Sequence, residues 1–218
     1  DPDPDKNPRL RLAVKEARAN SMPKDNIDRA IKKASGGEID AMEEIRYEGR
    51  GPGGVGIIVE ALTDNRNRAG SNIRSAFSKN GGALGEMNSV AFMWDKVGKI
   101  TYAAEAGSED AVMEAAIEAG AADVESDLVK PDIYEDAPGH TIWTAFEDLN
   151  DVAEAMSKVL GDPKSTAIVW KPQSEVPVTG EAVGTLFKLL DALDAEDDVS
   201  AVYSNEDISD EDAAKYAG

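Results

Sequence analysis

Five glycines set between two segments with strand-like alternation constrain the fold of this chain more than any other feature. They stand at positions 49, 51, 53, 54 and 56. After them in the sequence, Ile57, Val59 and Ala61 alternate like the inward residues of a half-buried strand. Glycine tolerates positive φ angles and close backbone approach, which the tip of a β-hairpin requires. The pattern therefore predicts a hairpin over residues 45–50 and 55–62.

A helix is predicted directly after this hairpin, over residues 65–79. Asn65 is a typical helix-capping residue, and the pair Gly81-Gly82 ends the pattern. The apolar positions between them follow helical spacing and are Ala69, Ile73, Ala76 and Phe77. The whole segment is rich in glycine, arginine and asparagine and offers no catalytic nucleophile or metal-binding motif. Its composition favours binding over catalysis.

The remaining periodicity predicts an α+β fold with three domains and a tail. Residues 1–43 form a helical module with helices that open near Pro8 and Pro23. Residues 44–98 form an α/β domain that ends in a strand around Val90–Trp94. Residues 99–172 follow the order β-α-β-β-α-β of a ferredoxin-like unit.

The last helix and strand are predicted around 180–192 and 199–204, and this pair cannot form a domain alone. We therefore expect residues 173–206 to rejoin residues 44–98, so that the ferredoxin-like domain is an insertion between them. The fold is then a helical module followed by two α/β sandwich-like domains, the second inserted into the first. Residues 207–218 are predicted to be an acidic, frayed tail.

Charge is distributed unevenly along the chain. The net charge is −20, yet residues 1–100 hold 17 Lys and Arg against 15 Asp and Glu, whereas residues 101–218 hold 6 against 28. This asymmetry favours contact of the first half with nucleic acid, from which the second half is repelled. An equally open interpretation is that the acidic residues only keep the second half soluble.

Composition also limits compartment and cofactor. The chain has no cysteine, which excludes disulfides and fits the cytosol. No apolar run approaches the roughly 20 residues that span a bilayer, so no membrane partner is expected. His140 is the only histidine, and no partners for acid-base or metal chemistry accompany it in the sequence. We predict no metal, no cofactor, no small-molecule substrate and no enzymatic activity.

Cationic residues with the spacing for phosphate contacts occur in two places. On the first two predicted helices they lie beside or opposite the apolar stripe, and they are Arg11, Lys15, Arg18, Arg29, Lys32 and Lys33. The hairpin and the helix after it add Arg46, Arg50, Arg66, Arg68 and Arg74. Arg66 and Arg68 stand near a helix start, where unpaired backbone amides also favour phosphate. The alternative for each stripe is an ordinary solvated face.

Small and flexible residues around the same segment predict a partner-facing loop. Its residues are Gly51, Gly53, Gly54, Gly82, Met87 and Asn88. The alternative for the glycines is a tight structural turn. They also form a G-x-G-x-x-G match at Gly51, Gly53 and Gly56, but this match leads into a strand rather than a helix, which argues against dinucleotide binding. Trp94, Trp143 and Trp170 stand singly on predicted strands, which favours core or interface packing over base stacking.

Three segments together resemble one known family. These are YEGRGPGGVGIIVEALTDNRNRAGSNIRSAF, with ANSMPKDNIDRAIKKASGG before it and NSVAFMWDKVG after it. They are similar to the YebC/PmpR family, and the similarity extends over residues 1–205. The resemblance implies three domains and a non-enzymatic gene-expression factor. The family is described both as transcriptional regulators that bind DNA and as ribosome-acting translation factors, including the mitochondrial translational activator of cytochrome oxidase subunit I.

The expected function is therefore a cytoplasmic, ribosome-associated translation factor that binds rRNA through its basic helices and its arginine- and glycine-rich segment. The resemblance extends this to relief of stalling at proline-rich sequences. The contacts are directed at phosphate, which suits a shaped ribonucleoprotein better than a short operator. The alternative is a DNA-binding transcriptional regulator that acts at promoters through the same residues. A protein-interaction adaptor that uses the acidic ferredoxin-like unit is a third class.

Overall fold

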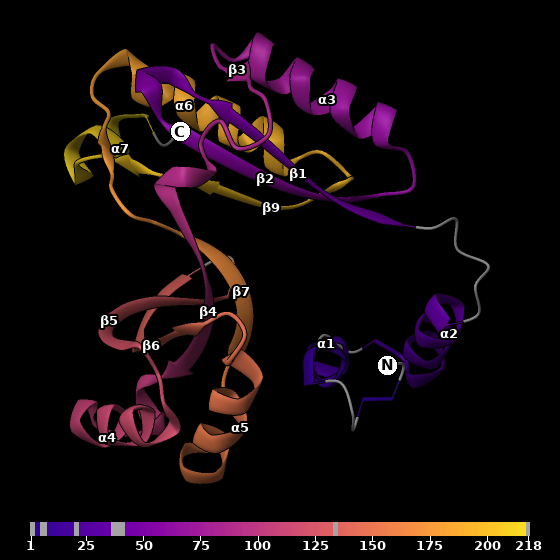
Figure 1. Cartoon of the computed structure of the whole chain (residues 1–218), viewed down its shortest axis with the longest axis vertical. Helices are drawn as coiled ribbons and strands as arrows, with labels where there is room; N and C mark the ends of the chain where they lie inside the picture. Colours follow the sequence, from indigo (N-terminus) through magenta and orange to yellow (C-terminus); the bar gives the residue numbers. More distant parts are fainter. Residues whose placement is uncertain (1–2, 5–7, 20–21, 36–41, 133–134, 217–218) are drawn as a thin grey trace. The chain divides into compact units, whose positions relative to one another are not determined.

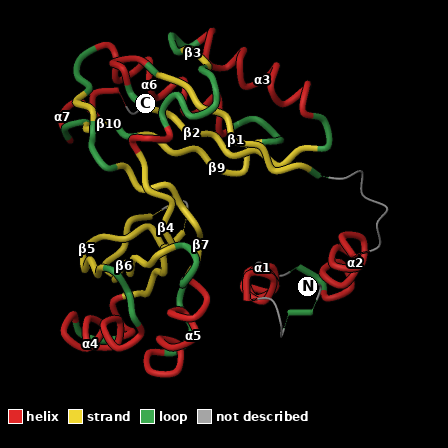
Figure 2. Tube along the Cα trace, in the orientation of Figure 1, coloured by secondary structure: helices red, strands yellow, loops and turns green. Residues whose placement is uncertain are grey.

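The computed structural model describes residues 3–4, 8–19, 22–35, 42–132 and 135–216. Helices and antiparallel sheets are both present, which confirms the predicted α+β class (Figure 2). The chain divides into two compact units, Asp1–Glu38 with Lys96–Val169, and Ile39–Asp95 with Trp170–Gly218. The domain boundaries expected from the sequence stay a prediction.

The second unit is built on a four-stranded sheet in the order β3-β1-β2-β9. Its strands are β1 (Glu43–Arg50), β2 (Gly56–Thr63), β3 (Ala83–Leu84) and β9 (Val199–Ser204). Each neighbouring pair is antiparallel, and a short 3-10 turn, η1 (Pro52–Gly54), joins β1 to β2. The predicted hairpin is confirmed. Its second strand pairs with β9, from the far end of the chain.

Helices α3 (Arg66–Lys79) and α6 (Glu181–Asp194) cover one face of this sheet (Figure 1). The apolar stripe predicted for α3 is buried together with the alternate residues of β2 and with Leu186 and Leu189 of α6. Phe77 is fully buried at the centre of this cluster. Burial of large apolar side chains, each contributing about 1.5–3 kcal/mol, fixes α3 on the sheet. The orientation of α3 therefore follows from its sequence pattern.

A smaller apolar cluster lies on the opposite face of the sheet. It joins Ile58 to Val90 and Trp94, with Trp170 packed against it. The strand predicted around Val90–Trp94 is wrong in part. Val90 precedes a 3-10 turn, η2 (Ala91–Met93), and β4 (Trp94–Ala103) begins only at Trp94. Trp94 is 5% exposed, in agreement with the predicted packing role.

The C-terminal part adds elements beside this core. Strands β8 (Val176–Pro177) and β10 (Glu206–Asp207) pair in parallel, and helix α7 (Asp210–Tyr216) follows. Residues 207–218 were predicted as a frayed tail, yet Tyr216 packs against the main apolar cluster and against Gly184 of α6. Ile208 packs against the same cluster, so two apolar contacts hold this acidic segment on the domain.

The strand-helix order of the first unit is β4, α4 (Glu109–Ala119), β5 (Asp123–Asp132), β6 (Glu135–Ala145), α5 (Leu149–Leu160) and β7 (Ser165–Pro172). The sheet order β5-β6-β4-β7 with two helices confirms the ferredoxin-like arrangement. A further 3-10 turn, η3 (Ala104–Ala106), leads from β4 toward α4. The fully buried side chains in the core of this unit include Ile100, Val112, Ile142 and Met156.

Two further helices lie near the N-terminus, α1 (Pro8–Ala19) and α2 (Lys24–Ser35). Val14 of α1 and Ile27 of α2 are buried, while Ala13 and Ala30 on the same helices are exposed. The helical module is thus held by a narrow apolar seam. No helix within the described residues has the length and apolar character needed to cross a membrane.

Candidate nucleic-acid interface

The start of α3 is built by a cap and by a turn from β2. The Asn65 side chain accepts a hydrogen bond from the Arg68 backbone N–H at 3.0 Å, and the Asn65 N–H donates to Thr63 Oγ1 at 3.0 Å. Asn65 therefore caps the helix as predicted, which is worth about 1 kcal/mol. The Tyr47 hydroxyl donates to the Arg66 carbonyl at 3.4 Å, and burial raises the pKa of Tyr47. These contacts fix the direction in which the first turn presents its arginines.

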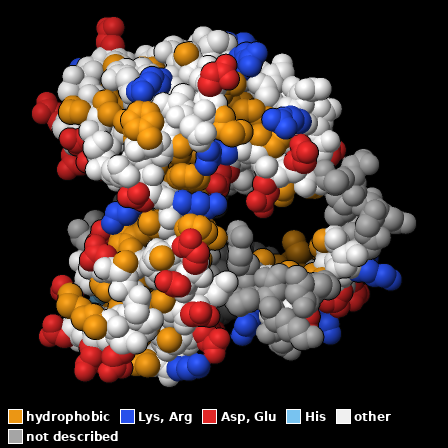
Figure 3. Space-filling model, viewed as in Figure 1, with side chains coloured by type: hydrophobic (Ala, Val, Ile, Leu, Met, Phe, Trp, Pro, Cys, Tyr) orange, Lys and Arg blue, Asp and Glu red, His pale blue; other side chains and the backbone are white. Residues whose placement is uncertain are grey.

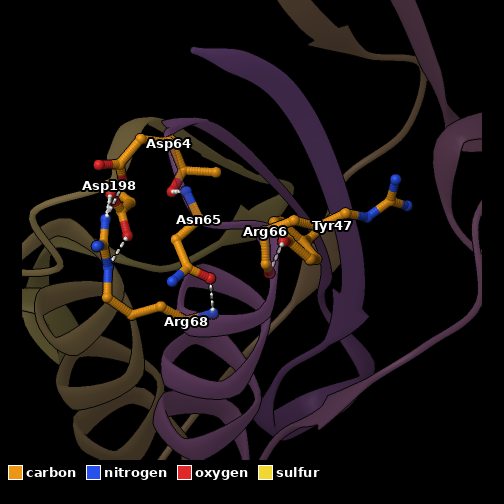
Figure 4. A network of polar contacts seen from close by, with 7 residues as sticks. Tyr47, Asp64, Asn65, Arg66, Arg68 and Asp198 are labelled. Carbon is orange, nitrogen blue, oxygen red and sulfur yellow. Dashed lines mark hydrogen bonds and ion pairs between the residues drawn. The ribbon is translucent and has the colours of Figure 1, made fainter. Parts of the chain in front are cut away.

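Arg68 is held by two carboxylates of its own unit (Figure 4). Its Nε donates to Asp198 Oδ2 at 3.1 Å, and one terminal nitrogen reaches Asp198 Oδ1 at 2.7 Å and Asp64 Oδ1 at 2.8 Å. Asp198 and then Asp64 raise the pKa of Arg68, while Arg68 lowers the pKa of Asp198. Arg68 was predicted as a phosphate ligand, but its guanidinium joins α3 to the turn before β9.

Arg66 and Arg74 are oriented differently from Arg68. Both are exposed, and neither side chain makes a hydrogen bond or ion pair with any residue that the structure describes. In Figure 4 the Arg66 guanidinium extends away from Asp64 and Asp198. The sequence of α3 holds four cationic residues, with Lys79 at its end, and no acidic residue at all. Asn67 and Ser71 on the same helix are exposed and add hydrogen-bonding groups.

The hairpin tip is only partly available to a partner. Gly53 and Gly54 are exposed with φ of 76° and 87°, values that favour glycine. Gly51, predicted to face a partner, is buried, and a Cβ there would lie 2.9 Å from Ile57 Cδ1 and 3.0 Å from Leu186 Cδ1. This glycine lets the turn pack on α6, which is the structural alternative. The three glycines of the G-x-G-x-x-G match lie in a turn between antiparallel strands, not at a helix start.

Arg50 and Arg46 flank this hairpin with different environments. Arg50 is exposed and donates to the Gly54 carbonyl at 3.4 Å. The Arg46 guanidinium lies 4.8 Å from the ring centroid of Trp170 and forms an ion pair with Glu48, with Nε 3.0 Å from Oε1. It also donates to Asn88 Oδ1 at 3.0 Å. Arg46 is thus engaged within its own unit, like Arg68.

The loop between β3 and β4 holds the remaining predicted partner-facing residues. Met87 is 65% exposed, and Asn88 is exposed with φ of 67°. Gly82 is half-buried, and a Cβ there would lie 2.9 Å from the Arg50 carbonyl oxygen. Phe92, which sequence reasoning did not select, is 69% exposed. Exposed large apolar side chains in one short segment are a contact surface of a kind that periodicity does not reveal.

The α1–α2 pair carries a second set of cations. Exposed side chains on these helices are Arg11, Arg18, Arg29 and Lys32. Arg11 also lowers the pKa of Glu154, after the larger effect of Lys158. Lys15 and Lys33 belong to the predicted set, but their side chains lie outside the described residues. Their assignment to a nucleic-acid interface stays a prediction.

The ferredoxin-like unit presents a different surface. All the charged residues of α4 are acidic, and they are Glu109, Asp110, Glu114 and Glu118. Acidic side chains are visible across the lower left part of Figure 3. His140 is 5% exposed, with Nδ1 2.8 Å from Ser126 Oγ and Nε2 3.1 Å from the Gly107 carbonyl oxygen. This histidine has a structural place in the core rather than a place in a cleft.

The comparisons with known proteins agree with this arrangement. Residues 42–206 match the TACO1/YebC second and third domain, and residues 1–37 match the TACO1/YebC protein N-terminal domain. A similar solved structure is that of a conserved hypothetical protein, Aq1575, from Aquifex aeolicus. It is 40% identical with a TM-score of 0.81, over 96% of this chain and 83% of that one.

The fold and the sequence matches define an α+β protein whose relatives are described as regulators. The chain belongs to the TACO1/YebC family, which is described as a family of transcriptional regulators rather than of enzymes. The family resemblance inferred from the sequence is therefore confirmed.

Proposed function

We propose that the protein is a ribosome-associated translation factor that binds ribosomal RNA through phosphate contacts. The observation that carries this proposal is the outer side of α3, where Arg66 and Arg74 are exposed in a helix without acidic residues. Cations with no carboxylate neighbour can neutralise phosphates and release counterions at little cost. The exposed arginines of α1 and α2 supply a second set of contacts of the same kind.

The position of α3 supports RNA of defined shape over a short DNA operator. The helix packs on a sheet beside α6, instead of standing as the second helix of a helix-turn-helix pair. Phosphate contacts fix the position of a protein on nucleic acid but carry no base sequence directly. A protein that recognises by phosphate position suits a folded ribonucleoprotein. The family description favours the second candidate, a regulator that binds promoter DNA through the same residues.

Sedimentation with ribosomes tests the first candidate. The variant Arg66→Glu/Arg74→Glu should bind about tenfold or more weakly at about 100 mM salt, because two phosphate contacts become repulsive. The control Lys158→Glu/Lys164→Glu makes the same change in net charge on exposed residues of the ferredoxin-like unit and should bind like the native protein. Equal loss in both variants would mean that only overall charge matters.

Competition with DNA separates the two candidates. Duplexes of promoter and of random sequence should displace the protein from ribosomes equally poorly. If one promoter duplex binds more tightly than ribosomes and discriminates against random sequence by about 100-fold or more, the transcriptional candidate replaces the first.

Relief of stalling at proline-rich sequences rests on the family resemblance alone. Reconstituted translation of two reporters, one with a proline run and one with alanines in its place, tests it. The protein should increase full-length product only from the proline reporter, and the Arg66→Glu/Arg74→Glu variant should not. An equal effect on both reporters would point to a general elongation role.

A further inference from the structure

Glu48 of β1 is a buried carboxylate that none of the proposed contacts uses. Its side chain is fully buried, whereas most glutamates lie at the surface. Glu48 pairs with Ile58 across the hairpin, and Ile58 belongs to the small apolar cluster with Val90 and Trp94. Its neighbour Tyr47 packs against the opposite, main cluster. Glu48 therefore points toward the loop that precedes β4.

The Glu48 carboxylate accepts hydrogen bonds from the backbone of that loop. Oε1 accepts the Asn88 N–H at 3.0 Å, and Oε2 accepts the N–H groups of Val90 and Ala91, both at 2.9 Å. The Glu48 carbonyl oxygen accepts the Gly85 N–H at 2.8 Å. A buried charge is tolerated only where hydrogen bonds and an opposite charge replace water. Here the loop supplies the hydrogen bonds, so its conformation and the charge of Glu48 depend on each other.

Arg46 makes a second connection between Glu48 and this loop. Arg46 forms an ion pair with Glu48 and donates to the side chain of Asn88, while its guanidinium lies over Trp170. Asn88 itself has φ of 67°, a left-handed conformation that is uncommon outside glycine and that asparagine tolerates better than most residues. The loop was expected to be flexible from its small residues. In the structure it is tied at four backbone amides and one side chain.

The tied loop holds two large apolar side chains in solvent. Met87 is 65% and Phe92 is 69% exposed, and both lie in the segment that Glu48 fixes. Exposed apolar groups on an ordered loop indicate contact with another molecule more than connection of two strands. Binding surfaces that are rigid beforehand lose less entropy on association. An unpaired RNA base offers a flat apolar face that stacks on an aromatic ring such as Phe92.

We propose that Glu48 is a positioning residue that fixes residues 85–92 in one conformation, so that Phe92 and Met87 form a preformed contact for an unpaired RNA base. The inference rests on the proposed RNA-binding function. It assigns a role to a carboxylate that would otherwise only repel phosphate. It also separates two tasks in this unit, since α3 supplies charge and the loop supplies shape.

A double-mutant cycle on ribosome binding tests the inference. Phe92→Ala and Glu48→Gln should each weaken binding about tenfold, and the double variant should be no weaker than either one, because both remove the same contact. Phe92→Trp should keep the affinity. Ile117→Ala, at a side chain on α4 that is also 69% exposed, is the matched control and should have no effect. Additive losses in the double variant would overturn the positioning role.

Two further readouts keep failure of this inference distinct from failure of the proposed function. Amide exchange at Asn88, Val90 and Ala91 should be slow in the native protein and at least about tenfold faster in Glu48→Gln; fast exchange in the native protein overturns the inference even if the variant does not fold. If Phe92→Ala binds normally while Arg66→Glu/Arg74→Glu does not, the loop role is lost and the RNA-binding function stands. If Phe92→Ala weakens binding to a protein partner but not binding to RNA, the loop contacts protein instead. If neither variant affects ribosome binding, the proposed function itself fails.

Discussion

The contrast between Arg66 and Arg68 gives the sharpest prediction. The two arginines stand two residues apart in the first turn of the same helix, yet Arg66 has no side-chain partner among the described residues and Arg68 is held by Asp198 and Asp64. Only a free guanidinium can exchange its counterions for a phosphate without first breaking ion pairs. We therefore expect Arg66→Ala to remove a nucleic-acid contact and Arg68→Ala to remove an internal one.

The size of the effect follows from counterion release. One lost phosphate contact lowers the slope of log affinity against log salt by about 0.7 to 0.9. Between about 50 and 200 mM salt, this makes the affinity of Arg66→Ala about threefold less sensitive than that of the native protein. Arg68→Ala should keep the native slope and lose thermal stability, because α3 is no longer joined to the turn at Asp198.

Fluorescence titration with an rRNA fragment over a series of salt concentrations measures the slopes, and calorimetry measures the thermal midpoints. Asp198→Ala is the control, since it removes the same internal contact from the other side and should lower the midpoint about as much as Arg68→Ala. The reasoning is refuted if Arg68→Ala reduces the slope as much as Arg66→Ala, because both arginines would then contact phosphate.

Three other predictions concern stability and titration. Gly49→Ala should lower the free energy of unfolding by about 1–3 kcal/mol in urea denaturation, because a Cβ there would lie 2.7 Å from Phe77 Cζ; native stability would contradict the packing. Burial alone would raise the pKa of Glu48, but three backbone N–H groups and Arg46 outweigh it and lower the pKa, so its stabilisation is present above pH 4.5 and is lost as the pH falls through the folded value. The Glu48→Gln variant should therefore have a lower free energy of unfolding at neutral pH, and this free energy should fall less on acidification than that of the native protein. The same fall in both proteins would be inconsistent with this role of Glu48. Burial raises the pKa of Tyr102 and Tyr203 to about 12, so ultraviolet titration should show two tyrosines that ionise well above pH 10. Their stabilisation, complete below about pH 10, should disappear as the pH passes 12, and a titration in which every tyrosine ionises near pH 10 would contradict these raised values.

Elements with strong local patterns could be predicted from the sequence. The hairpin, α3 with its Asn65 cap and the ferredoxin-like order all follow from periodicity and from glycine positions within a few residues. The segment around Val90 was harder, because a short apolar run fits a strand and a 3-10 turn equally well. Tyr216 shows the same limit, since its packing on α6 cannot be inferred from an acidic tail.

The candidate site was less predictable because its charges pair over long distances in sequence. Arg68 binds Asp198, which lies 130 residues later, and Glu48 binds amides about 40 residues away. Helical spacing in the sequence shows on which side of a helix a cation lies, but it does not show which cations have partners. The exposed set could be recognised from the sequence, whereas the division into free and engaged arginines required the three-dimensional arrangement.

The return of the chain to β2 has a consequence for biosynthesis. The Ser200 hydroxyl donates to the carbonyl of Glu60, 140 residues earlier, and β9 completes the edge of the sheet next to β2. During vectorial synthesis the ferredoxin-like segment emerges after the hairpin but before β9 and can fold locally, so the edge of β2 stays unpaired during this time. Nascent chains truncated before β9 therefore carry an unpaired strand, which is a site for self-association.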